Sequence, residues 1–475
     1  MNIVFVSSEA SPYCKSGGLG DVAGSLPAAL SRQKNVKVSV FLPYYRSVKQ
    51  SDAFEITNVC SFYVDLSWRH QYVGLYKARS KDKKLDVYFI DNDYYFDREG
   101  LYGHSDDGER FAYFSYAVLE ALSRLGLDPD VIHCNDWQTA LIPLLLHAKY
   151  QDKLGKAKTV FTIHNIEYQG KCDLYFLYDV LGLGNEYENT VLFDGCLNFM
   201  KSAILMSDAV TTVSETYARE LCYPYYSHGL SGIITEHFFK FFGIVNGIDV
   251  NGFDPSRDSK IHKRYGITDS KEGKAENKAF LRKKLKLNDA DCPLVGMVSR
   301  LVEHKGLDLV MPIMSELLSK GFQFVILGTG DQKYEDQLRY FEASHPGMLS
   351  LNLKFDQALA SQIYASSDLY LMPSKSEPCG LSQLIAMRYG TVPVVHTVGG
   401  LKDTVEAYDA STGKGCGITF QSFSSGDLKD AMYRAKALYE DPEEFGKVID
   451  NAMKYDSSWD VSCKKYLELY TKIIG

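Results

Sequence analysis

The stretch "NIVFVSSEASPYCKSGGLGDVAGSL" (residues 2–26) joins a strand-like run to a glycine-rich turn and the start of a helix. Its first part, "NIVFVSS", is apolar and rich in Val, Ile and Phe, which is typical of a buried strand. A buried strand that leads into a helix is the opening unit of a parallel α/β sheet. Because glycines near the end of a first strand are typical of phosphate-binding turns, the lysine just before them, Lys15, calls for an explanation.

The same alternation of short apolar runs and helical patterns continues along the chain. Helical patterns include residues 109–126 and 137–151. Strands are predicted at residues 2–8, 36–42, 85–91, 130–135, 158–165 and 208–214, and again at 294–300, 322–330, 349–355, 369–374, 391–396 and 416–420. Nearly continuous apolar strands that alternate with helices indicate parallel sheets covered on both faces. We therefore predict an α/β fold with two Rossmann-like, doubly wound domains that face each other across a deep cleft.

The length of 475 residues also favours two domains, because a single compact core rarely grows that large. We place the domains at residues 1–242 and 243–455, with the joint near "FFGIVNGID" (241–249). Residues 456–475 are predicted to form a helix that returns to the N-terminal domain. The lysine-rich stretch 256–288 is predicted to be a loop followed by an exposed helix.

Composition excludes several classes of protein. A net charge of −8 argues against broad nucleic-acid binding, and no apolar run is long enough to span a bilayer. The ten cysteines form no CxxC pair and no zinc-type spacing, and no secretion signal is evident. We therefore expect a cytoplasmic protein with reduced thiols, or a protein of the plastid stroma if the source is a plant or alga.

A dinucleotide site is the first alternative for the glycine-rich turn, because Gly18, Gly20 and Ala23 fit the pattern G-x-G-x-x-A. However, about ten residues separate these glycines from the strand, whereas a nicotinamide-binding fold places the first glycine directly after it. The second strand ends in Leu42 and Pro43, with no acidic residue for a ribose. We expect no cofactor. A plain helix start would explain the glycines but would leave the preceding lysine without a role.

Ligands of doubly wound sheets bind at the carboxyl ends of the strands, so the residues that follow each strand are the candidates for a site. Arg300 ends the strand at 294–300, Lys305 follows it, and Glu377 follows the strand at 369–374. Arg300 and Lys305 flank a strand-to-helix turn, where both cations could point at a phosphate group. Solvated surface charge is their alternative role.

Five motifs then resemble those of bacterial glycogen synthases and plant starch synthases: "KSGGLGDV" (15–22), "HNIEYQG" (164–170), "SRLVEHKG" (299–306), "PSKSEPCGLSQL" (373–384) and "TVGGLKDTV" (397–405). The resemblance runs in order over nearly the whole chain. It implies the GT-B fold and a retaining glucosyltransferase of glycosyltransferase family 5. The sequence departs from the family pattern at a few positions that bear on acceptor contacts: Asn135, Gln138, Phe253 and Ser376.

The resemblance also implies the members of the site. The catalytic residues would be Glu377, His164, Lys15, Arg300 and Lys305. The donor would contact Lys15, Gly17, Gly18, Asn246, Arg300, Lys305, Gly328, Phe355, Cys379, Gly380, Leu381 and Ser382. The acceptor would contact Glu9, Asp21, Asp136 and Trp137, whose alternative roles are capping and packing. In this interpretation Lys15 is a mobile clamp that reaches across the cleft to the diphosphate, while Phe355 stacks on the nucleobase.

Some alternatives stay open at this stage. Glu377 could be a covalent nucleophile, or it could hold the sugar while the diphosphate itself assists the acceptor hydroxyl. His164 could instead be a core residue. Asp91 and Asp93 form a D-x-D pattern that binds metals in the other major glycosyltransferase fold, but we predict no metal site.

The sequence thus predicts transfer of glucose, with retention, from ADP-glucose (or UDP-glucose) to the non-reducing end of an α-1,4-glucan. No nucleic acid and no membrane are expected as partners. An α-glucan phosphorylase is the rival enzyme, although no motif for a pyridoxal-binding lysine is evident, and a non-catalytic glucan-binding protein is the third possibility.

Overall fold

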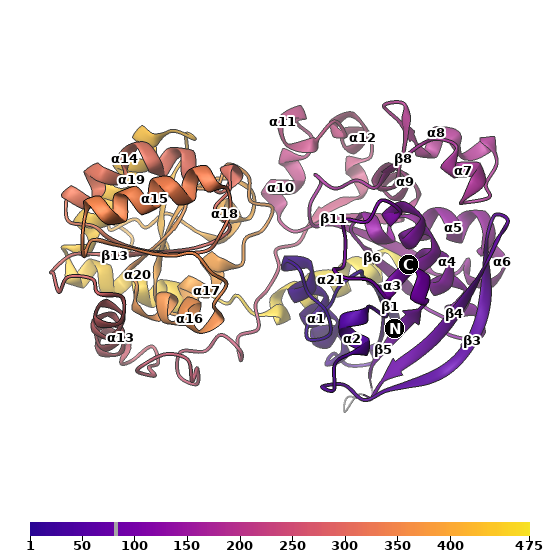
Figure 1. Cartoon of the computed structure of the whole chain (residues 1–475), viewed down its shortest axis with the longest axis horizontal. Coiled ribbons are helices and arrows are strands. Elements are labelled where there is room, and N and C mark those ends of the chain that lie inside the picture. Colours follow the sequence, from indigo (N-terminus) through magenta and orange to yellow (C-terminus); the bar gives the residue numbers. More distant parts are fainter. Residues whose placement is uncertain (80–83) are drawn as a thin grey trace. The chain divides into compact units, whose positions relative to one another are not determined.

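The computed structural model describes residues 1–79 and 84–475. Contacts divide the chain into two compact units. The N-terminal unit consists of Met1–Ile244 together with Trp459–Gly475, and the C-terminal unit consists of Val245–Ser458. Each unit is an α/β layer structure with its own sheet (Figure 1).

The N-terminal unit is built on a nine-stranded sheet in the order β12-β11-β7-β6-β1-β2-β5-β4-β3. Its strands are β1 (Asn2–Val6), β2 (Lys37–Pro43), β3 (Ile56–Leu66), β4 (Arg69–Ala78), β5 (Leu85–Asp91), β6 (Val131–Asn135), β7 (Lys158–Ile163), β11 (Ala209–Thr212) and β12 (Phe241–Gly243). All neighbours pair in parallel except β3 with β4 and β4 with β5. Because β1 pairs with β2 on one side and β6 on the other, the strand order reverses there, and ligands of open α/β sheets bind at such reversals.

Helices cover both faces of this sheet. The helices of the unit are α1 (Gly18–Ser31), α2 (Arg46–Lys49), α3 (Asp93–Phe96), α4 (Asp107–Arg124), α5 (Leu141–Lys149), α6 (Gln151–Leu154), α7 (Phe176–Asp179), α8 (Glu188–Val191), α9 (Phe199–Met206), α10 (Glu215–Glu220), α11 (Pro224–Ser227), α12 (Ser231–Glu236) and α21 (Trp459–Ile474). Three 3-10 turns and a small sheet complete the unit: η1 (Trp137–Thr139), η2 (Asn185–Tyr187), η3 (Phe238–Lys240), β8 (Lys171–Cys172), β9 (Leu192–Phe193) and β10 (Cys196–Asn198).

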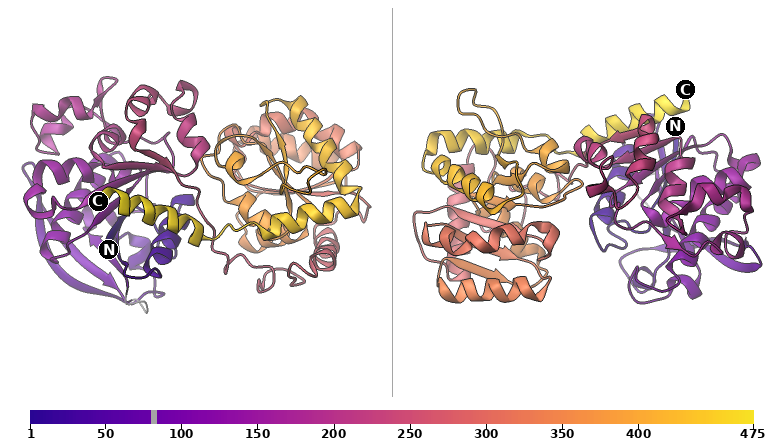
Figure 2. Two further views of the ribbon diagram at one scale, coloured as in Figure 1. Left: turned by 180° about the vertical axis from the view of Figure 1, so that it is seen from behind. Right: turned by 90° about the horizontal axis from the view of Figure 1, so that it is seen from above.

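The last helix, α21, packs against α1 although more than four hundred residues separate them in the chain (Figure 2). Trp459, Cys463 and Tyr470 on α21 are buried. The Tyr470 hydroxyl lies 2.6 Å from His133 Nδ1 on β6, and the other ring nitrogen of His133 lies 2.6 Å from the Thr162 hydroxyl on β7. The helix is therefore part of the core of the N-terminal unit.

The C-terminal unit is built on a wholly parallel six-stranded sheet in the order β15-β14-β13-β16-β17-β18. The strands are β13 (Leu294–Val298), β14 (Gln323–Leu327), β15 (Leu349–Asn352), β16 (Leu369–Met372), β17 (Val392–His396) and β18 (Ile418–Phe420). The helices are α13 (Ser270–Leu285), α14 (Leu307–Ser319), α15 (Gln332–Ser344), α16 (Gln357–Ser366), α17 (Ser382–Arg388), α18 (Gly399–Thr404), α19 (Ser425–Tyr439) and α20 (Pro442–Lys454), with a 3-10 turn η4 (Glu303–Lys305).

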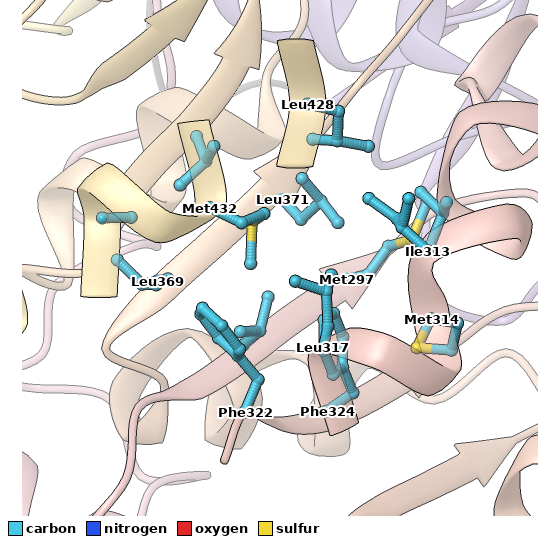
Figure 3. Close-up of a cluster of buried hydrophobic side chains, with 14 of the residues drawn as sticks. Met297, Ile313, Met314, Leu317, Phe322, Phe324, Leu369, Leu371, Leu428 and Met432 are labelled. Atoms are coloured by element: carbon cyan, nitrogen blue, oxygen red, sulfur yellow. The ribbon is translucent and has the colours of Figure 1, made fainter. Parts of the chain in front are cut away.

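The core of this unit lies between the sheet and the helices α14 and α19 (Figure 3). Met297 on β13 and Leu371 on β16 meet Leu317 on α14 and Met432 on α19, and each of these side chains is at most 2% exposed. Apolar residues at three- and four-residue spacing give α14 the stripe that packs on the strands.

Every strand predicted from the sequence coincides with a strand of the two main sheets. The hairpin β3–β4 was not predicted, because its alternating and partly exposed residues lack the continuous apolar signal of the parallel strands. One detail of the prediction was wrong, because β15 ends at Asn352 and Phe355 lies in the loop beyond the strand. The lysine-rich helix α13 is exposed at Lys271, Glu272, Glu276, Lys283 and Lys284, as predicted, but it also buries Lys274 and Arg282.

Among the described residues, every helix is too short or too polar to span a lipid bilayer.

Candidate functional site

The loop between β1 and α1 is held by Glu9. Its carboxylate accepts hydrogen bonds from the backbone N–H groups of Ser16 and Gly17, and the residue is only 3% exposed. A Cβ atom at Gly17 would approach no atom closer than 4.0 Å, and one at Gly18 would meet nothing within 4 Å. The packing of the protein itself therefore does not require glycine at either position, which leaves space for a ligand next to the backbone.

Lys15 and Asp21 form an ion pair in the same loop, with Nζ 2.7 Å from both carboxylate oxygens. From the sequence, Lys15 is predicted to contact the nucleotide-sugar donor and Asp21 the glucan acceptor. The structure brings the two side chains together, and both are about two-fifths exposed, at 42% and 41%. An exposed pair of this kind contributes little to stability, so the ammonium can leave its partner for a stronger anion.

Asp136 lies at the carboxyl end of β6 in a strained backbone conformation, with φ at 56° and ψ at 179°. Such dihedrals are uncommon for a residue other than glycine and are concentrated at functional sites. Asp136 Oδ1 accepts hydrogen bonds from the backbone N–H groups of His164, at 2.7 Å, and Asn165, at 3.3 Å. Burial raises the pKa of the Asp136 carboxyl to about 7.

His164, at the end of β7, is held as a neutral imidazole. Burial lowers the pKa of His164 to about 3. Its Nε2 lies 3.0 Å from Asn135 Oδ1, while the amide nitrogen of Asn135 donates to the carbonyl of Val6 at 3.0 Å. Because Asn135 offers only an acceptor to the ring, His164 Nε2 must donate, and Nδ1 is the acceptor that remains for a ligand hydroxyl.

Trp137, the fourth acceptor candidate, packs on the ring of Phe111 at 5.1 Å, close to edge-on, and on Phe199 at 6.0 Å. Gly170 permits this packing, since a Cβ there would lie 2.6 Å from Trp137 Cε3. Trp137 therefore does have the packing role that was its alternative to acceptor binding.

In the C-terminal unit, the structure brings Lys305 and Glu377 together. Lys305 Nζ donates to Glu377 Oε2 at 2.7 Å, and the Ser374 hydroxyl donates to the same oxygen at 3.0 Å. Glu377 is 7% exposed. Gly306 makes this approach possible: its φ is 77°, and a Cβ there would lie 1.9 Å from the carbonyl oxygen of Pro373. The loop after β13 and the loop after β16 therefore touch backbone to backbone.

Asn246 and Cys379 form a second contact in this unit, through a hydrogen bond to the Cys379 thiol. Burial raises the pKa of that thiol to about 12, so Cys379 is unreactive at neutral pH. Asn246 is 6% exposed, and within the described part of the chain its Oδ1 has no hydrogen-bond partner. A buried acceptor without a partner is costly in a folded protein and points to a ligand that completes it.

The other donor candidates fall into two groups. Gly328 and Ser382 already have structural roles: a Cβ at Gly328 would lie 1.8 Å from the Ser299 carbonyl oxygen, and the Ser382 hydroxyl bonds with Tyr364 and Tyr370. Arg300 is exposed, and Phe355 is 88% exposed, so both side chains are accessible. Gly380 has φ at 74°, which favours glycine and turns the chain into Leu381 and α17.

Comparisons with known proteins show the family of the chain. Residues 2–236 match the description of a starch synthase catalytic domain, and residues 277–452 match that of group 1 glycosyl transferases. The glycogen synthase of Clostridium novyi (strain NT) is 44% identical over 480 residues, which cover 100% of this chain and 99% of that protein. The glycogen synthase of Alkaliphilus metalliredigens (strain QYMF) is 45% identical and is covered completely, as is this chain. The chain belongs to the glycogen synthase and starch synthase family.

Solved structures of this family and of a more distant enzyme support the fold. The catalytic domain of starch synthase IV from Arabidopsis thaliana, bound to ADP and acarbose, superposes with a TM-score of 0.90 at 36% identity, over 99% of each chain. Sucrose-phosphate synthase from Thermosynechococcus elongatus shares the fold, with a TM-score of 0.63 at 16% identity over 99% and 98% of the two chains. The prediction of a GT-B glycosyltransferase fold with two Rossmann-like domains is confirmed.

The two carboxylates of the D-x-D pattern, Asp91 and Asp93, form ion pairs with one lysine. Lys49 Nζ lies 2.6 Å from Asp91 and 2.5 Å from Asp93. In residues 1–79 and 84–475 no cluster of three or more His, Cys, Asp or Glu side chains has the geometry of a metal site.

The sequence analysis missed three residues that support the family motifs. Ser374 binds Glu377, Gly306 lets the two loops meet, and Gly400 brings α18 against the Cys379 backbone, where a Cβ would lie 2.2 Å from the carbonyl oxygen. All three lie within the quoted motifs, but the motifs do not indicate which partner each residue contacts.

Proposed function

We propose that this protein transfers glucose, with retention, from ADP-glucose to the non-reducing end of an α-1,4-glucan. The observation that carries the proposal is the buried Lys305–Glu377 pair at the carboxyl ends of β13 and β16, in a chain of the glycogen synthase family. ADP is favoured over UDP because the starch synthase IV structure is bound to ADP.

In this proposal Lys305 and Arg300 neutralise the diphosphate that leaves, while Glu377 favours positive charge at the anomeric carbon. Glu377 is already paired with an ammonium, which makes its oxygen a weaker nucleophile. We therefore favour retention in which the diphosphate assists the acceptor hydroxyl on the same face of the sugar. His164 Nδ1 accepts a hydrogen bond from a glucose hydroxyl, which its neutral state permits.

The Asn246 Oδ1 atom, which lacks a hydrogen-bond partner in the described part of the chain, would accept a hydrogen bond from the nucleotide sugar, beside Cys379 and Gly380. The acceptor glucan would contact the N-terminal unit at Glu9, Asp21, Asp136 and Trp137. All ten cysteines are free thiols, in accordance with a reducing compartment, and we propose the cytoplasm as the site of action.

A donor panel tests the proposal. ADP-glucose and UDP-glucose would each be supplied with glycogen, and the new linkage would be identified by the anomeric signal in NMR spectra. We expect α-1,4 product from ADP-glucose, and we expect Glu377→Gln to lose most of the turnover while the protein stays folded. Release of glucose 1-phosphate from glycogen and inorganic phosphate, with no nucleotide-sugar turnover, would instead identify a phosphorylase.

A further inference from the structure

A buried lysine of α13, outside the family motifs in the sequence, joins the ends of two helices in the C-terminal unit. Lys274 Nζ donates to the carbonyl oxygens of Ala365, at 3.3 Å, and Tyr389, at 3.1 Å, and to the Thr391 hydroxyl at 2.8 Å. Ala365 lies in the last turn of α16, and Tyr389 is the residue that ends α17. The three acceptors match the three N–H donors of an ammonium group, so the buried charge is fully satisfied.

Two neighbouring hydroxyl groups complete the same network. The Tyr265 hydroxyl donates to the Tyr389 carbonyl at 2.8 Å, and the single proton of the Thr391 hydroxyl is within range of the carbonyls of Tyr364 and Ser367. All of these carbonyls belong to the carboxyl ends of α16 and α17, where backbone C=O groups lack partners within the helix. A cation at this position also interacts favourably with both helix dipoles.

The opposite ends of these two helices carry segments of the donor site. Phe355 directly precedes the cap of α16, Asp356, whose carboxylate accepts a hydrogen bond from Leu359 N at 2.9 Å. Cys379, Gly380 and Leu381 directly precede α17. Both helices are short and stiff, about 15 Å and 10 Å long from their rise per residue, so a shift at one end is transmitted to the other.

We propose that Lys274 is a positioning residue for the nucleotide-sugar site, because one ammonium fixes the carboxyl ends of α16 and α17 and thereby sets the places of residues 355–356 and 379–381. The inference rests on the proposed function for the identity of the ligand. The role of Lys274 in positioning residues 355–356 and 379–381 does not depend on which ligand binds there.

The same helix offers a matched control. Arg282 is also a buried cation of α13, but it donates to Gln323 Oε1 on β14 at 2.8 Å and to the Cys292 carbonyl at 3.1 Å. No hydrogen bond found for Arg282 in the described residues involves α16 or α17. Lys274→Met and Arg282→Met therefore each remove a buried basic side chain of α13, and only Lys274 joins the two helices.

The experiment compares these variants with the wild type by ADP calorimetry, steady-state kinetics and amide hydrogen exchange at a temperature where all are folded. We expect Lys274→Met to raise the ADP Kd and the KM for ADP-glucose by about tenfold, the equivalent of one charge-assisted hydrogen bond, with a smaller change in kcat. Exchange should quicken at residues 355–359 and 379–385. Arg282→Met should lower the unfolding temperature but leave ADP Kd and these segments unchanged, and Lys274→Arg should restore part of the affinity.

Equal effects of Lys274→Met and Arg282→Met on ADP Kd and on exchange would overturn the proposal. If Lys274→Met does not fold, Thr391→Val carries the test, because it removes one acceptor of Lys274 and one donor to α16; unchanged exchange in both segments would then refute the idea. A wild type that binds no ADP would refute the proposed function alone, while the exchange data would still decide the role of Lys274.

Discussion

At the scale of single residues, the two ion pairs of the candidate site differ in burial, and this difference determines what each can do. The side chains of Lys305 and Glu377 are 21% and 9% exposed, so their charges are screened little and the pair persists. Lys15 and Asp21 are exposed, and such pairs contribute about 0–1 kcal/mol. Lys15 is therefore free to exchange its partner, whereas Lys305 is a fixed part of the C-terminal unit.

This contrast predicts different kinetic effects for the two lysines. We expect Lys15→Ala to lower kcat by roughly thirty- to thousandfold, because a charge-assisted contact made in the reacting complex contributes about 2–4 kcal/mol. Lys305→Ala should weaken equilibrium binding of ADP more than Lys15→Ala does. Steady-state kinetics paired with ADP calorimetry measures both quantities. A Lys15→Ala protein that keeps its kcat but binds ADP as poorly as Lys305→Ala would show that the loop is a static phosphate site.

Phe355 offers a second residue-scale prediction. Its ring is 88% exposed, so its truncation removes no core packing. If it stacks on the base, which contributes on the order of 1 kcal/mol, Phe355→Ala should raise the donor KM several-fold with little change in kcat and no change in unfolding temperature. An unchanged KM would exclude base stacking at this position.

Because the pKa of Asp136 is raised, we expect the free energy of unfolding to depend on pH. The folded protein keeps the proton up to about pH 7, whereas the unfolded chain releases it near pH 4, so the folded state binds more protons in between. The wild type should therefore lose stability relative to Asp136→Asn as pH rises from about 4 to 7, by at most about 1.4 kcal/mol per pH unit. Urea denaturation of both proteins across this range provides the measurement. A constant difference between them would mean that the carboxyl is not perturbed.

At the scale of elements, α21 is held to the sheet of the N-terminal unit by a buried polar contact as well as by packing. Tyr470→Phe removes the hydroxyl next to His133 and leaves a buried ring nitrogen without its partner. We expect a loss of about 1–3 kcal/mol in the free energy of unfolding, the usual penalty for a buried group left unpaired. Chemical denaturation measures it. His133, whose pKa burial lowers to about 3, stays neutral, so the loss should be the same at pH 6 and pH 8.

Elements were also the scale at which the sequence was most informative. The parallel strands were predictable because both of their faces are buried, so that successive residues are apolar and form a continuous run in the sequence. The hairpin β3–β4 was not, since an exposed antiparallel ribbon contains many polar and aromatic residues. Within the site, the residue types could be predicted from motifs, but the pairing of Lys305 with Glu377 spans 72 positions and depends on how two loops meet at Gly306.

At the scale of the whole molecule, the distribution of charge predicts that catalysis does not need a divalent cation. In the proposed function Arg300 and Lys305 neutralise the diphosphate, and the two D-x-D carboxylates are already paired with Lys49. Activity with ADP-glucose and glycogen should survive dialysis against a chelator within about twofold, as expected where cationic side chains take the place of a metal. Complete loss of activity that Mn²⁺ restores would return Asp91 and Asp93 to the site.

The divided N-terminal unit has a consequence for how the protein is made. Its sheet leaves the ribosome first, but α21, which fills part of its core, is translated only after the intervening residues Val245–Ser458. At about 5–20 residues per second, those 214 residues take roughly 10–40 s to translate, so the sheet of the N-terminal unit waits that long for its last helix. During that interval the nascent chain exposes the apolar surface on α1 and next to His133 that α21 later covers, and exposed apolar surface of this kind is what chaperones bind.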